Sequence, residues 1–410
     1  MKILIISQYF WPENFKVNDL AECLAEKGHF VNVLTGQPNY PQGKFYTGYS
    51  FFAPRNEVHK GVKIRRVPII PRGKAGGIRL AANYFSFVIS SCFYILFQHK
   101  KYDAVFVFAT SPITVAFPSI VYQKFHRVNT LLWVLDLWPE SVSAASSVRA
   151  EWILRLLSKM VKYIYSRMDK ILISSKTFRA SLEAKGVPSQ KIYYAPNWAE
   201  ELYEKGTIDK NKYQSLLPDG FKVMFTGNIG EAQDCEALLA TAKHLTSMKS
   251  NVQLVMVGDG RKRTWFEEEV KKNCLSNVHF LGRFPIDEMP HIIAHTDVVL
   301  VSLKDEPIFA LTAPTRIQTA LVSAKPIAAM LNGEGAAIVN EAGAGLTCPA
   351  GDAIAFAQNL QTLSQYSAAQ LNEMGMRGKQ YYEANFQREK IIVEIENLLS
   401  AAFKKGTIEA

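Results

Sequence analysis

The residues best suited to bind a charged ligand lie in a loop and a helix start of the second half. The apolar run "DVVLVSL" (residues 297–303) leads into this loop, which contains Glu306, and Pro314 ends it. We expect Thr315 to cap the helix that follows, whose free N–H groups attract anions. Arg316 adds a planar guanidinium that matches phosphate. Because the Glu306 carboxylate can accept hydrogen bonds from sugar hydroxyls, the pattern suits a nucleotide-sugar. A capped structural helix with a surface acid explains the same residues.

A second anion site is expected at "FTGNIGEAQDCEALLATA", where a strand, a glycine-containing turn and a helix follow one another. Glycine lets a ligand approach the backbone, and the helix N-terminus favours phosphate. A tight structural turn is the alternative. The stretch "VGDGRKR" is a weaker candidate, since its basic residues can be simply solvated. The donor-binding residues that we predict are Gly227, Asn228, Gly230, Glu231, Arg261, Arg283, Thr312, Pro314, Thr315, Gln318 and Thr319.

A carboxylate that acts as a general base is expected in the first half, at "LLWVLDLWPESV". Asp136 follows an apolar strand, where desolvation raises a carboxyl pKa towards the range of a general base. A turn or helix cap ahead of Pro139 is the alternative. The loop "SQYFWPENFKVND" contains no glycine, which excludes a Rossmann fingerprint, but its aromatic and polar residues suit a sugar or lipid-linked acceptor. Packing of these aromatic residues on each other is the alternative. The acceptor-binding residues that we predict are Trp11, Glu13, Asn14, Trp138 and Glu140, and the catalytic ones are Asp136, Arg316 and Glu306.

These loops require parallel sheets to position them. The chain has 410 residues, too many for one ordinary core, and short apolar strands alternate with helices almost throughout. The alternation pauses at "YYAPNWAEELYEKGTIDKNKYQSLLPDG". We therefore predict an α/β protein with two doubly wound Rossmann-like domains facing across a cleft, at residues 1–197 and 198–385. The terminal helix, at about 386–410, is expected to pack on one domain or to cross between them.

The charge is divided unevenly. Residues 1–200 contain 26 Lys and Arg against 12 Asp and Glu, whereas the remainder contains 21 against 25. A basic half favours nucleic acid, anionic lipid or polyphosphate, but no nucleic-acid-binding signature accompanies it, so nucleic acid is not expected. Five scattered cysteines without CxxC or metal spacing indicate a reduced, cytosolic chain without a metal site. No signal peptide is recognised.

A charge-free stretch at residues 80–97 raises the question of a membrane. A buried helix, an interfacial helix and a true span are all compatible with its length and polarity. Basic residues flank it, and "VRAEWILRLLSKMVKYIYSRMD" (148–169) is a second basic and apolar stretch. We expect attachment of the first half to the surface of an anionic membrane, without a span.

Taken together, these stretches resemble bacterial glycosyltransferases of family 4 with the GT-B fold. The O-antigen and capsule enzymes of the WbuB type, including L-fucosamine transferases, are the most similar. The resemblance covers nearly the whole chain and rests on "ISQYFWPENFKVNDLAECLAEKGHFVNVLTGQPNYPQG", "DLWPES", "APNW", "FTGNIGEAQ", "VGDG" and "PTRIQTALVSAKPIAA". It implies a nucleotide-sugar donor on the C-terminal domain, most simply a UDP-sugar such as UDP-N-acetyl-L-fucosamine. It also implies an undecaprenyl-diphosphate-linked acceptor on the N-terminal domain, in O-antigen or capsular polysaccharide synthesis.

The resemblance further implies a retaining reaction without metal or cofactor, at the inner face of the bacterial plasma membrane. Three positions depart from the family pattern. The second Glu of the usual Glu-x7-Glu pair is replaced by Pro314, or by Thr319 when "SAKPIAA" is aligned. Asn228 and Gln233 occupy the region where the family often has an Arg and a Lys. Asp136 stands where many members have His. A GT-B sugar-nucleotide epimerase and a non-catalytic membrane-surface binding subunit are the rival functions.

Overall fold

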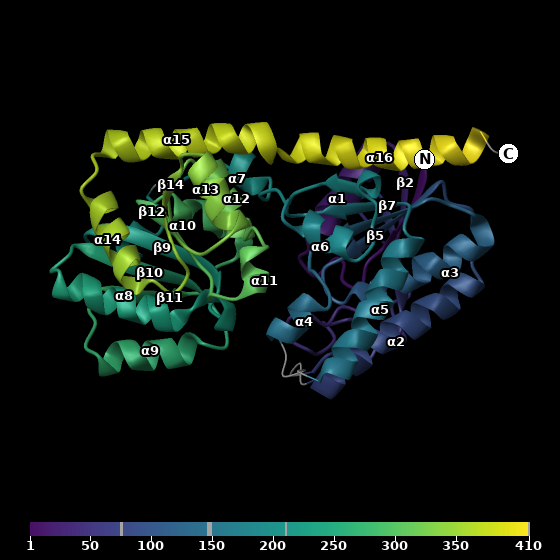
Figure 1. Cartoon of the computed structure of the whole chain (residues 1–410), viewed down its shortest axis with the longest axis horizontal. Coiled ribbons are helices and arrows are strands. Elements are labelled where there is room, and N and C mark those ends of the chain that lie inside the picture. The colour runs from purple at the N-terminus through teal and green to yellow at the C-terminus, as the bar shows by residue number, and fades with distance from the viewer. Residues whose placement is uncertain (74–76, 146–149, 210, 409–410) are drawn as a thin grey trace. The chain divides into compact units, whose positions relative to one another are not determined.

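The computed structural model describes residues 1–73, 77–145, 150–209 and 211–408 (Figure 1). It divides into two compact units, one formed by Met1–Pro196 with Glu389–Ala410 and the other by Asn197–Arg388. The sequence placed these boundaries at 197/198 and 385/386. In each unit a largely parallel sheet is covered by helices, so the prediction of two doubly wound α/β domains is confirmed.

In the described part of the first unit, the sheet has eight strands in the order β3-β4-β2-β1-β5-β6-β7-β8. All neighbours pair in parallel except β3 and β4, which are antiparallel. Chain order reverses between β1 and β5, and ligands of doubly wound sheets bind beyond the carboxyl ends of the strands at such a point. The strands are β1 (Lys2–Ile6), β2 (Phe30–Gly36), β3 (Asn56–His59), β4 (Val62–Val67), β5 (Ala104–Ala109), β6 (Thr130–Val134), β7 (Lys170–Ile173) and β8 (Ile192–Tyr194).

Three of the first unit's helices, α2, α3 and α5, pack side by side (Figure 1). The last helix, α16, returns to this unit, where Glu396 pairs with Lys27 at 2.7 Å and with His29 at 2.9 Å. The helices are α1 (Lys16–Glu26), α2 (Gly77–Leu96), α3 (Phe117–His126), α4 (Glu140–Ala145), α5 (Glu151–Arg167), α6 (Phe178–Ala184) and α16 (Arg388–Ile408), with 3-10 turns at Ile113–Ala116 and Ser189–Lys191.

The described part of the second unit contains a six-stranded parallel sheet in the order β11-β10-β9-β12-β13-β14, with its reversal between β9 and β12. Its strands are β9 (Phe221–Asn228), β10 (Val252–Asp259), β11 (Val278–Gly282), β12 (Val298–Ser302), β13 (Ile327–Met330) and β14 (Gly345–Cys348). Buried apolar side chains fill both faces of this sheet, because α8 and α14 contribute to one core cluster and α12, α13 and α15 to another.

The helices of the second unit connect these strands and place their N-termini near the strand ends (Figure 1). They are α7 (Leu202–Lys205), α8 (Cys235–Ser247), α9 (Arg263–Lys272), α10 (Met289–Ile293), α11 (Pro307–Ala310), α12 (Thr315–Val322), α13 (Glu334–Glu341), α14 (Ala353–Ser364) and α15 (Ala368–Asn385), with 3-10 turns at Gln214–Leu216, Glu231–Gln233 and Ile286–Glu288.

Candidate functional site

A pocket of about 410 Å³ opens at the reversal point of the second unit, beyond the carboxyl ends of β9 and β12. The loops after these two strands are joined, since the Ser302 hydroxyl donates to the carbonyl of Gln233 at 2.7 Å and the Lys304 N–H to that of Ala232 at 2.9 Å. The residues that line the pocket are Glu200, Tyr203, Thr226, Gly227, Asn228, Gln233, Leu303, Pro314, Thr315, Arg316 and Thr319.

Arg316 supplies a fixed positive charge to this pocket. Its Nε donates to the carbonyl of Thr226 at 2.5 Å, and its guanidinium carbon lies 4.0 Å from the centre of the Phe225 ring. A Cβ added at Gly227 would meet the guanidinium at 3.3 Å, so glycine leaves the room that this side chain occupies. Burial lowers the pKa of Arg316 to about 10, which still leaves the group protonated at neutral pH. The guanidinium is therefore an ordered cation before any ligand binds.

The start of α12 differs from the predicted one. The helix begins at Thr315, and Pro314 occupies the N-cap position with a φ of −59° and no side-chain cap. The prediction that Thr315 caps the helix is therefore wrong. The Pro314 carbonyl already accepts the Ile317 N–H at 2.8 Å, and the fixed ring of proline sets the helical entry without a hydroxyl. Thr315 instead lies in the first turn and lines the pocket.

Glycines allow the ends of β9 and β10 to come into contact. Gly258 has a φ of 145°, and a Cβ there would lie 1.8 Å from the carbonyl oxygen of Gly227. A Cβ at Gly260 would lie 2.2 Å from the carbonyl oxygen of Ile229. The turn "VGDG" therefore packs directly against the backbone that borders the pocket. A larger residue at Gly258 would displace the backbone of Gly227.

The pocket contains the catalytic candidate Arg316 and five of the predicted donor-binding residues, and it leaves the other predicted residues of this unit outside its lining. Gln318 is buried, Glu231 lies between Lys262 at 3.4 Å and Lys304 at 3.2 Å, and Thr312 donates its hydroxyl to the carbonyl of Phe309. Residues outside the lining are Gly230, Glu231, Arg261, Arg283, Glu306, Thr312 and Gln318, of which Glu231, Arg261, Arg283 and Glu306 are exposed. The sequence did not single out Glu200, Tyr203, Thr226 and Leu303 as ligand contacts.

In the first unit, polar side chains gather beyond the carboxyl ends of the strands on both sides of the β1/β5 reversal. Asp136 follows β6, and burial raises the pKa of its carboxyl to about 6. Tyr84 of α2 is within electrostatic reach of Asp136 and hydrogen-bonds to Ser111, which follows β5. A carboxylate whose pKa is near neutral, beside hydroxyl groups, can accept a hydrogen bond from an acceptor hydroxyl or take its proton.

Glu13 is buried and braces two loops. One carboxylate oxygen accepts the N–H groups of Asn39 and Tyr40, both at 2.7 Å, and the other accepts that of Phe10 at 3.3 Å. The side chain is 2% exposed. These contacts tie the loop after β1 to the loop after β2, so the structure gives Glu13 a positioning role beside the predicted acceptor site.

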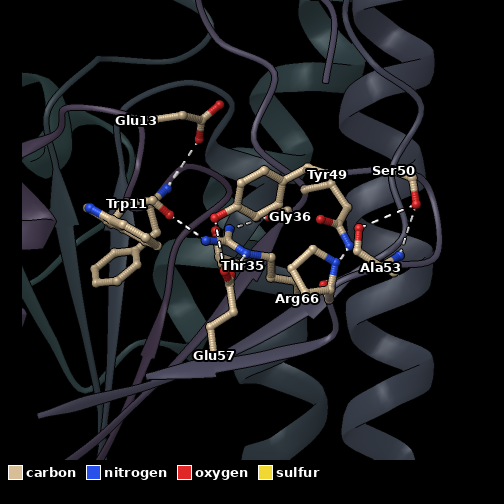
Figure 2. Close-up of polar contacts among 12 residues, drawn as sticks. Trp11, Glu13, Thr35, Gly36, Tyr49, Ser50, Ala53, Glu57 and Arg66 are labelled. Carbon is tan, nitrogen blue, oxygen red and sulfur yellow. Dashed lines mark hydrogen bonds and ion pairs between the residues drawn. The ribbon is translucent and has the colours of Figure 1, made fainter. Parts of the chain in front are cut away.

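Arg66 holds the same loop from β4 (Figure 2). Its fully buried guanidinium donates to the carbonyl oxygens of Trp11 and Gly36 and pairs with the Glu57 carboxylate, and the Tyr49 ring lies over it. The Trp11 ring stacks on His59 with 4.2 Å between ring centres. Trp11 is therefore ordered, whereas Asn14 is exposed.

Trp138 and Glu140 follow Asp136 into α4. Trp138 is 8% exposed, and its indole N–H has no hydrogen-bond partner among the described residues. Glu140 accepts hydrogen bonds from Lys185 at 2.5 Å and from the Ser181 hydroxyl at 3.2 Å. Trp138 is thus buried in the first unit, and Glu140 contacts α6 and the residue that follows it.

We expect Glu13 to make folding stability depend on pH. Burial raises its pKa from 4.5 to about 7, although the backbone N–H groups act in the opposite direction. The folded state then holds a proton that the unfolded state has lost, so this contribution is greatest below pH 4.5 and disappears as the pH rises through about 7. A shift of this size corresponds to about 3 kcal/mol. The difference in unfolding midpoint between wild type and Glu13→Gln, measured from pH 4.5 to 8, should fall across this window. A flat difference would contradict the expectation.

No group of three or more His, Cys, Asp or Glu side chains is arranged to hold a metal ion within residues 1–73, 77–145, 150–209 and 211–408.

Comparison with known proteins adds family matches for both units. Residues 220–365 match the model of "Glycosyl transferases group 1", and residues 15–198 match that of "Glycosyl transferase 4-like domain". The probable glycosyltransferase WbjE of Pseudomonas aeruginosa is 27% identical over 300 residues, covering 69% of this chain and 73% of WbjE. The putative colanic acid biosynthesis glycosyl transferase WcaI of Escherichia coli (strain K12) is 24% identical over 317 residues, covering 74% of this chain and 77% of WcaI.

The fold also matches a solved structure along the whole chain. Anabaena Alr3699/HepE in complex with UDP-glucose has a TM-score of 0.69 to this chain at 16% identity, with 98% of this chain and 100% of that chain covered.

Proposed function

The chain belongs to the GT-B glycosyltransferases, and we propose that it moves a sugar from a nucleotide-sugar bound in the second unit to a lipid-linked saccharide bound in the first. The observation that supports this most is Arg316, an ordered cation in a pocket at the β9/β12 reversal. Departure of a nucleoside diphosphate builds negative charge on the leaving group. A fixed cation stabilises that charge more in the transition state than in the ground state, which is what accelerates the reaction.

The donor is a UDP-sugar in this proposal. HepE, which shares the fold, was solved with UDP-glucose. The pocket volume of about 410 Å³ lies in the usual range of small-molecule sites. UDP-N-acetyl-L-fucosamine is the specific donor that the WbuB-type resemblance favours. Because Arg316 supplies the charge, we propose transfer without metal or cofactor, so EDTA should leave turnover unchanged.

The acceptor contacts the strand ends of the first unit, near Asp136. We propose that the ionised Asp136 accepts a hydrogen bond from the reacting hydroxyl and so orients it towards the donor sugar. We propose that the reaction retains the anomeric configuration, as the resemblance to family 4 implies, with Asp136 in this orienting role. The acceptor is proposed to be an undecaprenyl-diphosphate-linked saccharide of O-antigen or capsule synthesis. The name of WcaI, a relative, refers to colanic acid biosynthesis.

We also propose that the first unit attaches to the inner face of the bacterial plasma membrane through α2. Among the described residues, α2 is the one helix long and apolar enough to span a bilayer, yet only 22% of its apolar window is buried. The buried-core interpretation of this stretch is therefore wrong. The side chains facing the protein include Asn83 and Ser91, whereas the exposed stripe consists of Ile78, Phe85, Ile89, Phe93 and Leu96. An exposed apolar stripe of this size indicates a partner surface.

Attachment in the plane of the membrane fits α2 better than a span. The Asn83 amide donates to the carbonyl of Ile70 at 2.6 Å and accepts from Gln8 at 2.7 Å, so the helix is fixed to its own sheet. Helix α5, which packs against α3 as α2 does, exposes Trp152 and Leu156 and carries Arg155, Lys159 and Lys162. Apolar side chains flanked by basic ones match an anionic lipid surface.

The double variant Phe85→Ser/Ile89→Ser should release the chain from membranes. Each exposed apolar side chain contributes on the order of 1.5–3 kcal/mol when it is buried in lipid, so co-sedimentation with vesicles containing anionic lipid should fall at least tenfold. The control is Val58→Ser, which removes an equally exposed apolar residue from β3. High salt should weaken binding of the wild type. Vesicle binding of the double variant equal to that of wild type would exclude this face.

Nucleotide binding tests the donor assignment directly. The full chain is titrated calorimetrically with UDP, GDP and dTDP, and the titration is repeated with Arg316→Gln. We expect UDP to bind best and the variant to lose at least tenfold in affinity. Equal affinity of wild type and variant for each nucleotide would mean that the pocket at Arg316 is not the donor site.

A further inference from the structure

Arg72 is a cation among tyrosines, at a place where the proposed acceptor binds. It follows β4 beyond the carboxyl end of the sheet. Its guanidinium carbon lies 5.0 Å from the centre of the Tyr40 ring and 6.0 Å from that of Tyr9, and its Nη1 donates to the Tyr9 hydroxyl at 3.2 Å. Within the described ranges 1–73, 77–145, 150–209 and 211–408, Arg72 forms no ion pair with a carboxylate. The charge is thus partly desolvated and has no anionic partner among the described residues.

The surroundings of Arg72 are ordered. Its backbone N–H donates to the Asn39 side chain at 3.0 Å. The Tyr9 ring stacks on Phe15 with 5.1 Å between centres and 11° between planes, and Tyr40 lies tilted against both rings, at 5.6 and 5.3 Å. Tyr9 is 3% exposed, whereas Tyr40 is 38% exposed. The cluster is therefore rigid and open to solvent on the Tyr40 side.

The acidic groups near the cluster do not neutralise Arg72. Glu13 acts electrostatically on Tyr9, but both of its oxygens already accept backbone N–H groups. The charge of Arg72 lowers the pKa of Tyr84, and that of Asp136 raises it. Arg72 and the proposed acceptor-orienting carboxylate therefore lie within electrostatic reach of the same tyrosine.

The Tyr9 hydroxyl adds a neutral donor beside the guanidinium. Burial raises the pKa of Tyr9 far above its usual value, so the group stays protonated at neutral pH. Its oxygen accepts an N–H from Arg72, which leaves the O–H proton for a ligand. One phosphate oxygen could accept from this O–H while another accepts from the guanidinium, whose planar fork fits the spacing of phosphate oxygens.

We propose that Arg72 and the Tyr9 hydroxyl bind a phosphate ester group of the acceptor, next to the sugar that receives the transferred residue. This rests on the proposed function, since it names a further group of the same acceptor. A chain that recognises phosphate in this way selects a lipid-linked saccharide over the same saccharide without its lipid phosphate. It also separates the acceptor's phosphate from the donor's diphosphate, which Arg316 binds in the other unit.

The test uses probes that require no sugar transfer. Binding of farnesyl diphosphate, farnesol and inorganic pyrophosphate to the full chain is measured in one detergent, for wild type, Arg72→Gln and Tyr9→Phe. Arg65→Gln is the matched control, because Arg65 also lies over a tyrosine ring, that of Tyr94 at 4.8 Å, but within β4. Arg316→Gln is measured alongside, so that diphosphate binding in the donor pocket can be subtracted.

We expect wild type, Arg65→Gln and Arg316→Gln to prefer farnesyl diphosphate over farnesol at least tenfold. Once the diphosphate binding that depends on Arg316 is subtracted, Arg72→Gln should bind the two alike, and Tyr9→Phe should lose about threefold of the preference. Competition by inorganic pyrophosphate at similar concentration would assign the site to free phosphate and overturn the acceptor proposal. An undiminished preference of Arg72→Gln for farnesyl diphosphate over farnesol would also overturn it. Equal losses of affinity for both probes would do the same, because a purely structural role of Arg72 predicts them. If Arg72→Gln does not fold, Arg72→Met, which also removes the charge, takes its place.

The two proposals fail separately. Loss of phosphate preference in Arg72→Gln together with no turnover of any nucleotide-sugar would refute the proposed function alone. Sugar transfer that is equally efficient with and without Arg72, on an acceptor with phosphate, would refute the role of Arg72 alone.

Discussion

Arg316→Ala should reduce kcat by about 100-fold or more. Removing one preorganised donor from the site where charge develops typically costs this much. The Arg316 guanidinium is ordered by the Thr226 carbonyl and the Phe225 ring, so it requires no rearrangement as the leaving group departs. Steady-state kinetics with saturating acceptor give the measurement. The fall should appear in kcat as well as in kcat/KM, since the interaction strengthens in the transition state.

Two controls separate this catalytic effect from a loss of folding. Arg316→Lys keeps the charge but not the planar fork, so it should lie between wild type and Arg316→Ala. Arg377→Ala removes an exposed arginine of the same unit, whose partner is Glu373 on α15, and should retain wild-type kinetics. A folded Arg316→Ala chain with near-wild-type kcat/KM would show that Arg316 does not bind the diphosphate.

Asp136→Asn should lower transfer about 100-fold or more while leaving donor affinity unchanged. An amide of the same shape still fits the site beyond β6, but it is a weaker acceptor for the reacting hydroxyl and cannot take a proton. Donor affinity should persist because the donor pocket is lined by residues of the second unit alone. Transfer kinetics and UDP titration are measured on the same preparation. Weakened UDP binding with unchanged transfer would contradict the assignment.

The pH profile gives Asp136 a second signature. Because burial raises its carboxyl pKa to about 6, the ionised form is lost as the pH falls through 6. Wild-type kcat/KM should therefore decline below pH 6, and the residual activity of Asp136→Asn should lack this limb. Asp169→Asn, which changes a carboxylate that caps Thr130 at the opposite end of β6, serves as the control. An acid limb that persists in Asp136→Asn would assign it to another group.

The repeating strands and helices could be predicted from the sequence because buried parallel strands read as continuous apolar runs. "AVFVFA" and "TLLWV" are buried at every position. The resemblance to GT-B glycosyltransferases of family 4 is confirmed at the level of the family, whereas the WbuB-type donor and acceptor stay predictions. The edge strand β3 and its neighbour β4 were not predicted, since "NEVH" and "VKIRRV" are half polar and do not stand out as strands.

The residues of the site were harder to predict where they depend on distant contacts. Gly227, Asn228 and Arg316 follow local turn and helix-start patterns, and the pocket contains all three. Glu200 and Tyr203 come from a polar segment that reads as a linker, and only the fold brings it to the end of β9. Glu13 has the polarity of a surface ligand contact, but three backbone N–H groups from two loops surround its carboxylate. Such long-range pairing has no local sequence signal.

The central proposal is tested most directly by following the product. The full chain is incubated with UDP-, GDP- and dTDP-sugars and a lipid-diphosphate-linked sugar, without added metal, and the lipid product is analysed by mass spectrometry. We predict one added sugar residue from a UDP-sugar, and none with Arg316→Ala. Nucleotide-sugar that binds but stays intact, or that is recovered as an epimer while the lipid-linked acceptor keeps its mass, would contradict glycosyl transfer.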